Sequence, residues 1–90
     1  MSVAETMETK LRAAFQPTHL EIEDQSHLHE GHAGHDGRGE SHFHLVLVSP
    51  AFAGQSRIAR QRAVYQVLAE ELAGRVHALS LETRTPEEAR

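Results

Sequence analysis

The chain has 90 residues, a formal net charge of −4 and no cysteine. This length allows one compact domain with a single core, and the lack of cysteine excludes disulfides, thiolate metal ligands from this chain and a cysteine nucleophile. The acidic balance argues against a generally basic nucleic-acid-binding protein. No apolar run approaches the roughly 18 residues of a membrane span, and the N-terminus does not resemble a signal peptide. We therefore expect a protein of the cytosol or of an organellar matrix, with the bacterial cytoplasm as the preferred location, and without membrane partners.

The first expected elements are a helix and a strand. The helix covers residues 3–15, because Ser2 and Glu5 match a capping box and apolar residues follow at helical spacing. Pro17 cannot continue the helix. Residues 19–24 then alternate between apolar and polar, which is typical of a half-buried strand.

A histidine- and glycine-rich loop is expected over residues 26–40. The strand after it should cover residues 41–49, with Phe43, Leu45 and Leu47 on one face. Two consecutive strands joined by one loop predict an antiparallel hairpin.

The second half of the chain predicts a helix and a third strand. The helix should cover residues 57–73, capped by Ser56 and ended by a left-handed Gly74. A strand over residues 75–83 and a frayed polar tail over 84–90 follow. Because a strand–helix–strand connection normally makes a parallel pair, the order helix–strand–strand–helix–strand predicts an α/β (α+β) fold. Its small mixed three-stranded sheet should be covered on one face by two helices.

Histidine is concentrated in one part of the chain. Six of the eight histidines lie between His27 and His44, and such tracts can bind metal. The alternative is a solvated polar loop, and the sequence leaves both interpretations open. His77 should open the third strand on the face of Leu79 and Leu81. It is either a structural histidine at the edge of the core or a residue placed to meet side chains of the loop.

The beginning of the second helix is cationic. Arg57, Arg60 and Arg62 lie there, and Gln61 should fall on the apolar side, where its amide needs a partner. A solvated basic turn is the simpler interpretation, and a nucleic-acid or docking patch is the functional alternative. No set of nucleophile, base and orienting residue is visible, so an enzyme is not expected.

Five segments of the chain resemble the BolA family, in the family's order and spacing. They are LRAAFQP at 11–17, LEIEDQS at 20–26, ESHFHLVLVSPAFAG at 40–54, RQRAVYQVLAEEL at 60–72 and VHALSL at 76–81. The resemblance implies one BolA-like domain over residues 1–90, with an ordered core at about 3–83. It also implies a class II KH-like fold.

The resemblance further implies a monothiol glutaredoxin as partner and a [2Fe–2S] cluster shared across the heterodimer. The isolated chain should hold no cofactor and be a monomer or a weak homodimer. In the family one ligand is the histidine of the VHAL segment, which is His77 here. A second comes from the loop, where the family pattern D-x-S-x-x-H falls on residues 24–29 and favours His29, with His32 and His27 as rivals. The glutaredoxin cysteine and glutathione would supply the remaining ligands.

Two alternative functions stay open beside this one. Some BolA-family members act as DNA-binding transcriptional regulators of morphology and stress responses, for which Arg57, Arg60 and Arg62 are the candidate residues. A third possibility is a histidine-rich protein that binds zinc or nickel without a partner. One departure from the family pattern stands beside these arginines: Gln61 replaces the usual histidine, so no ligand role is carried over to it.

Overall fold

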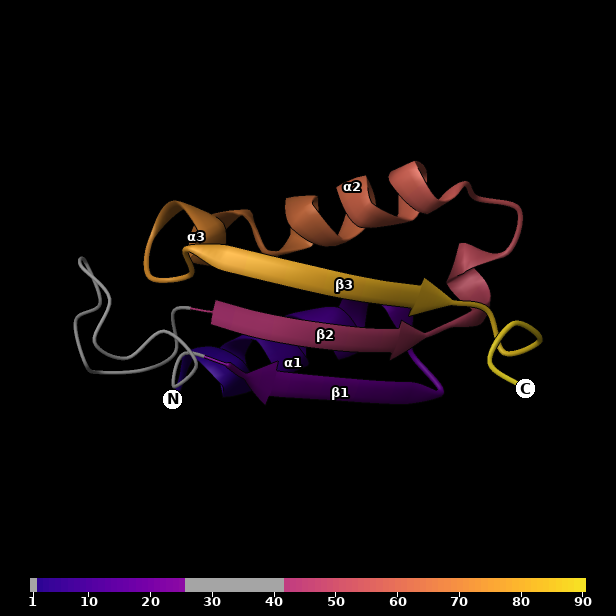
Figure 1. Ribbon diagram of the computed structural model, residues 1–90, viewed down its shortest axis with the longest axis horizontal. Coiled ribbons are helices and arrows are strands. Elements are labelled where there is room, and N and C mark those ends of the chain that lie inside the picture. Colours follow the sequence, from indigo (N-terminus) through magenta and orange to yellow (C-terminus); the bar gives the residue numbers. More distant parts are fainter. Residues whose placement is uncertain (1, 26–41) are drawn as a thin grey trace.

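The computed structural model describes residues 2–25 and 42–90, and every expectation for residues 26–41 lies outside this part. Figure 1 shows the arrangement of the elements along the chain. In order they are α1 (Val3–Phe15), β1 (His19–Asp24), β2 (His42–Val48), the 3-10 turn η2 (Pro50–Phe52), α2 (Arg57–Val67), α3 (Ala69–Ala73) and β3 (Ala78–Arg84).

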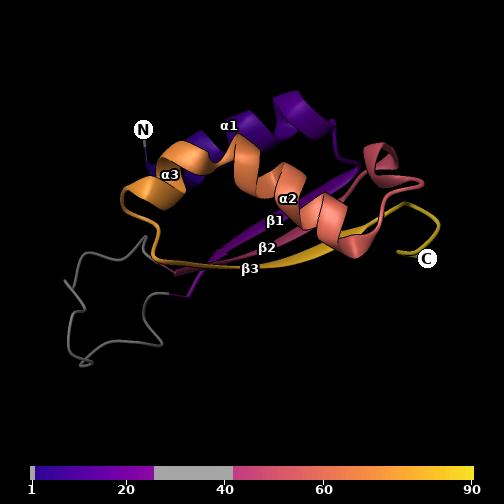
Figure 2. The same ribbon diagram turned by 90° about the horizontal axis from the view of Figure 1, so that it is seen from above.

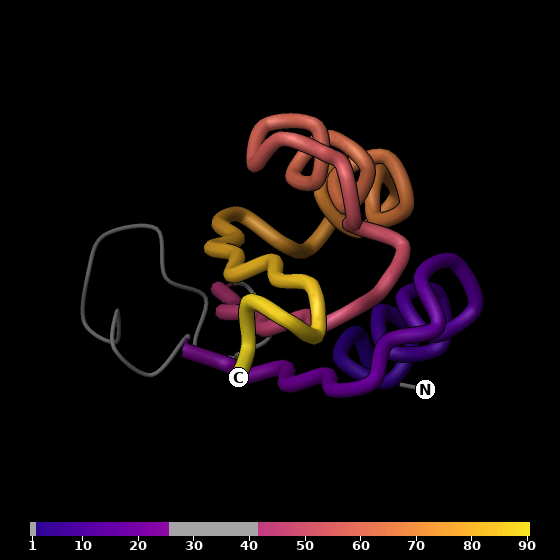
Figure 3. The backbone as a smooth tube through the Cα atoms, turned by 90° about the vertical axis from the view of Figure 1, so that its right-hand side faces the viewer, coloured from indigo at the N-terminus to yellow at the C-terminus, as the bar shows by residue number. Residues whose placement is uncertain are grey.

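The three strands form one mixed sheet in the order β1-β2-β3. β1 pairs with β2 in antiparallel fashion and β2 pairs with β3 in parallel. Figure 2 shows the helices above one face of the sheet, and Figure 3, which looks roughly along the strands, shows α1 and α2 on the same side. The predicted fold class is confirmed.

The core lies between the sheet and the helices. Side chains alternate along a strand, so Phe43, Leu45 and Leu47 of β2 all point to the helical side and are buried. Met7 and Leu11 of α1 pack against the same cluster. Because none of the helices in the described residues covers the other face of the sheet (Figure 2), polar side chains can occupy that face.

The ends of α1 follow from its flanking residues. The hydroxyl of Ser2 accepts a hydrogen bond from the Glu5 N–H at 3.1 Å, as predicted for the N-cap. At the other end Gln16 adopts a left-handed conformation, with φ 46°, just before Pro17. A left-handed conformation was predicted for Gly74, at the end of the second helix. This prediction is wrong, because Gly74 has φ −110°.

The helix predicted over residues 57–73 is interrupted at Leu68. α2 ends at Val67 and α3 begins at Ala69, although the Leu68 N–H still donates to the carbonyl of Val64 at 3.0 Å. Leu68 stays fully buried. Since the apolar spacing continues through this single-residue departure, periodicity could not reveal it.

The C-terminal residues also differ from the prediction. β3 extends to Arg84, and Thr85 is only 5% exposed. The Thr85 hydroxyl accepts from the Glu88 N–H at 3.2 Å, while Glu88 accepts from the Thr85 N–H at 2.9 Å. This reciprocal cap orders the segment that was expected to fray. Within the part of the chain that the structure describes, no helix is long and apolar enough to cross a membrane.

Candidate functional site

The first candidate site is the end of the sheet where β2 and β3 begin. The parallel register pairs His42 with Ala78, so His77 lies beside His42, and their ring centroids are 6.4 Å apart. The N–H of Gln25 donates to the carbonyl of His42 at 2.7 Å. The chain therefore leaves the described structure after Gln25 and re-enters it at His42 at the same end of the sheet as His77.

His77 occupies a different environment from the one predicted. It precedes β3 rather than opening it, and its side chain is exposed. The exposure contradicts the interpretation as a structural histidine at the edge of the core, and the alternative, a contact with side chains of the loop, stays a prediction. The cause is the turn after α3, in which the Val76 N–H donates to the carbonyl of Glu71 at 3.0 Å and Val76 becomes buried. The alternation of the strand therefore starts only at Ala78, which leaves the His77 imidazole at the surface.

The two imidazoles at this end are potential metal ligands, but they do not form a complete metal site. Imidazole nitrogen is a common iron and zinc ligand, and two imidazoles on one ion with bonds of about 2.1 Å have ring centres roughly 5–6 Å apart. The separation between His42 and His77, 6.4 Å, is slightly wider. Among residues 2–25 and 42–90 no group of three or more potential ligands could hold a metal ion. The predicted loop ligands His29, His32 and His27 lie outside these residues.

His42 is not among the ligands predicted from the sequence. Its position beside His77 depends on the parallel pairing of β2 with β3 and on where β3 begins. The predicted parallel pair was the available signal, but it does not specify which residues face each other, and β3 begins at Ala78 rather than at residue 75.

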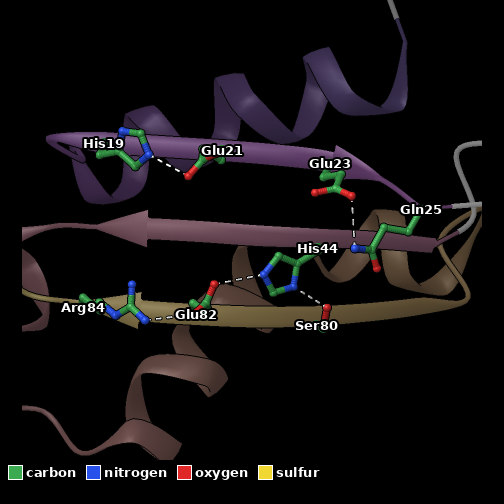
Figure 4. A network of polar contacts seen from close by, with 8 residues as sticks. All are labelled: His19, Glu21, Glu23, Gln25, His44, Ser80, Glu82 and Arg84. Atoms are coloured by element: carbon green, nitrogen blue, oxygen red, sulfur yellow. Dashed lines mark hydrogen bonds and ion pairs between the residues drawn. The ribbon is translucent and has the colours of Figure 1, made fainter. Parts of the chain in front are cut away.

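His44, two residues further along β2, is already engaged on the open face of the sheet (Figure 4). Its Nδ1 lies 2.6 Å from the Ser80 hydroxyl and its Nε2 lies 3.1 Å from the Glu82 carboxylate. A carboxylate only accepts, so Nε2 donates to Glu82. The hydrogen bond from His44, and after it the charge of Arg84, lowers the pKa of Glu82. His44 thus contributes to the sheet rather than to the site at its end.

Arg60, one of the three predicted nucleic-acid-binding arginines, is buried at the opposite end of the sheet. Its Nε donates to the carbonyl of Gln55 at 3.0 Å and its Nη1 to the carbonyl of Thr83 at 3.2 Å. Nη1 and Nη2 also hold the two oxygens of Glu88, at 2.7 and 3.1 Å. The guanidinium carbon lies 5.8 Å from the centre of the Phe52 ring. The prediction that Arg60 belongs to an exposed cationic patch is therefore wrong.

The neighbours of Arg60 on α2 show how the helix is rotated. Arg57 and Arg62 are exposed, while Gln61 lines a polar groove instead of the apolar side. Ile58 and Tyr65, which helical spacing places on the same apolar side as Gln61, are 62% and 39% exposed. The buried stripe is centred on Arg60 and Val64, because Arg60 has partners for its donors inside the fold. A sequence pattern that treats arginine as a surface residue cannot find this rotation.

The ion pair between Arg60 and Glu88 has a clear electrostatic consequence. The two hydrogen bonds from Arg60, followed by that from the Thr85 N–H, lower the pKa of Glu88 to about 2. Because hydrogen bonds to the charged form favour ionisation, Glu88 carries its negative charge at all ordinary pH values. The Arg60 charge is correspondingly neutralised within the protein.

The fold and the site define a class of small mixed α/β domains. Its features are a three-stranded sheet, helices on one face and an exposed histidine before the last strand. The family model described as BolA-like protein matches residues 11–88. The chain belongs to the BolA-like family.

Individual relatives agree with this membership. The chain is 50% identical over 88 residues to the DNA-binding transcriptional regulator BolA of Escherichia coli (strain K12), covering 98% of this chain and 80% of the relative. Among solved structures, BolA1 from Arabidopsis thaliana superposes with a TM-score of 0.90 at 42% identity, covering 100% of this chain and 98% of that one. The BolA domain of SufE1 from the same plant gives 0.85 at 42% identity, with 98% of both chains covered.

Proposed function

We propose that this protein is a non-enzymatic adaptor that pairs with a monothiol glutaredoxin to hold a shared [2Fe–2S] cluster, in iron–sulfur assembly, trafficking or iron signalling. The observation that carries the proposal is the exposed His77 imidazole at the end of the sheet, with His42 beside it. The described residues on either side of segment 26–41, Gln25 and His42, are hydrogen-bonded to each other at this end of the sheet, and the segment between them contains four histidines. A chain without cysteine can offer a cluster only such nitrogen or oxygen ligands, so the thiolates must come from the partner.

In this proposal, histidines of this chain would ligate the cluster and other residues would position them. His77 would ligate one iron, and a loop histidine, His29 with His32 and His27 as rivals, would supply the second nitrogen. Two imidazoles on one iron raise the reduction potential of a [2Fe–2S] cluster over that of an all-thiolate one. The hydrogen bond between Gln25 and His42 holds the two ends of the loop together. The parallel pairing of β2 with β3 keeps this junction beside His77.

Reconstitution with a glutathione-loaded monothiol glutaredoxin tests the proposal. We expect a coloured heterodimer whose electron paramagnetic resonance, after reduction, shows nitrogen ligation. His77→Ala and His29→Ala should each alter this signature, and His42→Ala tests whether the neighbouring ring takes part. His19→Ala is the matched control, because His19 is exposed but lies at the other end of the sheet, paired with Val48. An unchanged signature in both His77→Ala and His29→Ala would contradict the ligand assignment.

A second candidate function is DNA-binding transcriptional regulation of morphology or stress responses. It is favoured by the name of the Escherichia coli relative and by the exposure of Arg57 and Arg62 on α2. The engagement of Arg60 by Glu88 reduces the charge available to phosphate. The function predicts duplex binding that weakens steeply with salt and is lost in the double variant Arg57→Ala and Arg62→Ala. Binding that is absent, or independent of salt, would argue against it.

A further inference from the structure

A polar groove of about 620 Å³ lies between the beginning of α2 and the second half of β3. Arg57, Arg60 and Gln61 line one side, and Leu81, Thr83 and Arg84 line the other. The strand register places this groove at the opposite end of the sheet from His77, because Arg84 pairs with Val48 whereas Ala78 pairs with His42. The groove is therefore separate from the proposed cluster site.

One wall of the groove offers a strand edge. β3 is the last strand of the sheet in the described part of the chain. The carbonyl of Arg84 accepts from the N–H of Ser49 on the β2 side, whereas the preceding carbonyl, that of Thr83, accepts from Arg60 on the groove side. Since the backbone groups of a strand alternate in direction, those of Leu81 and Leu79 also face outward. An exposed edge of this kind can pair with another extended chain.

The groove also shows which chemical group it can bind. The Glu88 carboxylate sits there in a two-bond contact with Arg60 and takes a third hydrogen bond from the Thr85 N–H. A planar guanidinium fork is the usual receptor for a carboxylate. Glu88, whose side chain is 48% exposed, therefore acts as a ligand that the protein supplies to itself at the surface.

The remaining charges favour a peptide over a nucleic acid. The lining contains the arginines Arg57, Arg60 and Arg84 but also the carboxylates Glu82 and Glu88. A chain of phosphates would meet these two carboxylates, whereas a peptide with one isolated carboxylate need not. An extended peptide can also pair in register with the outward N–H and C=O groups of β3.

We propose that this groove is a docking site for an extended segment of a protein partner, which pairs with the outer edge of β3 and places one carboxylate on Arg60 in competition with Glu88. Arg57, at the rim of the groove, attracts the incoming negative charge. Docking at this end leaves His77 accessible at the other, so the protein could hold two partners at once.

Titration with a short peptide tests the proposal. The probe is the capped pentapeptide acetyl-Thr-Val-Glu-Val-Thr-amide, added to the nitrogen-15-labelled full chain and followed by NMR. We expect the amide signals of Leu79, Leu81 and Thr83 to shift. Glu88→Ala should tighten the apparent Kd by about tenfold, because a competitor that occupies the site is removed. The neighbouring exposed residue gives the control, Glu87→Ala, which should leave the Kd unchanged.

Changes in the peptide and at the rim of the groove test two contacts separately: the pairing with the edge of β3 and the carboxylate on Arg60. Glutamine in place of the peptide glutamate should abolish the gain from Glu88→Ala, and N-methylation of the valines should abolish strand pairing. Arg57→Ala should weaken binding without disturbing the fold, since Arg57 is exposed. If the glutamine peptide binds as tightly as the glutamate peptide, the proposal is overturned. It is also overturned if Glu88→Ala increases the affinity for a single-stranded oligonucleotide and not for the peptide. His77→Ala should leave peptide binding unchanged, which keeps this test independent of the glutaredoxin experiment.

Discussion

The two ends of the sheet use polar side chains in opposite ways. At the histidine end the His77 imidazole is exposed and lies outside the strand. At the arginine end the Arg60 side chain is only 10% exposed, and its donors are directed at two carbonyls and a carboxylate. In the free protein the hydrogen bonds of Arg60 support the folded structure, whereas the His77 imidazole is presented directly to solvent.

The largest expected effect on stability comes from removing the Arg60 guanidinium at the arginine end of the sheet. Arg60→Met should lower the free energy of unfolding by about 2 kcal/mol, since the carbonyls of Gln55 and Thr83 and the Glu88 carboxylate all lose their donor. Chemical denaturation followed by circular dichroism measures the change. Arg62→Met is the control on the same helix, and because Arg62 is exposed its effect should be within about 0.5 kcal/mol. If Arg60→Met and Arg62→Met changed the free energy of unfolding equally, the buried contacts of Arg60 would not stabilise the arginine end.

The next effect concerns pH. The pKa of Glu88 is about 2 in the folded protein and near 4.5 ordinarily, so its contribution to stability is present above pH 4.5 and is lost as the pH falls toward 2. Glu88→Gln should therefore be less stable than the parent protein at neutral pH, and the difference should shrink across this window. Thermal unfolding between pH 2 and 7 measures it. A constant difference between the two proteins would show that Glu88 does not act through its charge.

A smaller effect is expected on the open face between the two ends. His44→Ala should raise the pKa of Glu82 toward its ordinary value, because the hydrogen bond from His44 is the main cause of the lowered pKa. The neighbouring Arg84 should keep part of the lowering. NMR titration of the side-chain carboxyl carbon reports the change, and His19→Ala should leave the Glu82 titration as it was.

The smallest effect on stability should come from the histidine end. His77→Ala should change the free energy of unfolding by less than about 0.5 kcal/mol, because an exposed side chain outside a strand contributes little to the folded state. The same denaturation measurement as for Arg60→Met checks this. A loss of stability comparable to that of Arg60→Met would mean that His77 is structural after all.

Local pattern was enough to place most of the elements. The helix over residues 3–15 and the strand over 19–24 are confirmed with their bounds, as are the antiparallel hairpin and the parallel pairing of the third strand. These features depend on caps, prolines and apolar spacing, which act between residues close together in the chain. The resemblance to the BolA family, carried by five short segments, is confirmed by the family model.

The contacts that distinguish the two ends needed the tertiary structure. Arg60 is buried because Glu88, 28 residues later, and the carbonyl of Thr83 reach it across the fold. His42 stands beside His77 because β2 and β3 pair in one register, which begins at Ala78 rather than at residue 75. Such pairings join segments far apart in the chain, and no spacing along the sequence records them. In the sequence, a buried arginine on a helix cannot be distinguished from an exposed one, and the same is true of a histidine near a strand. Only the packing of β3 against its neighbours determined that Arg60 is buried and His77 exposed.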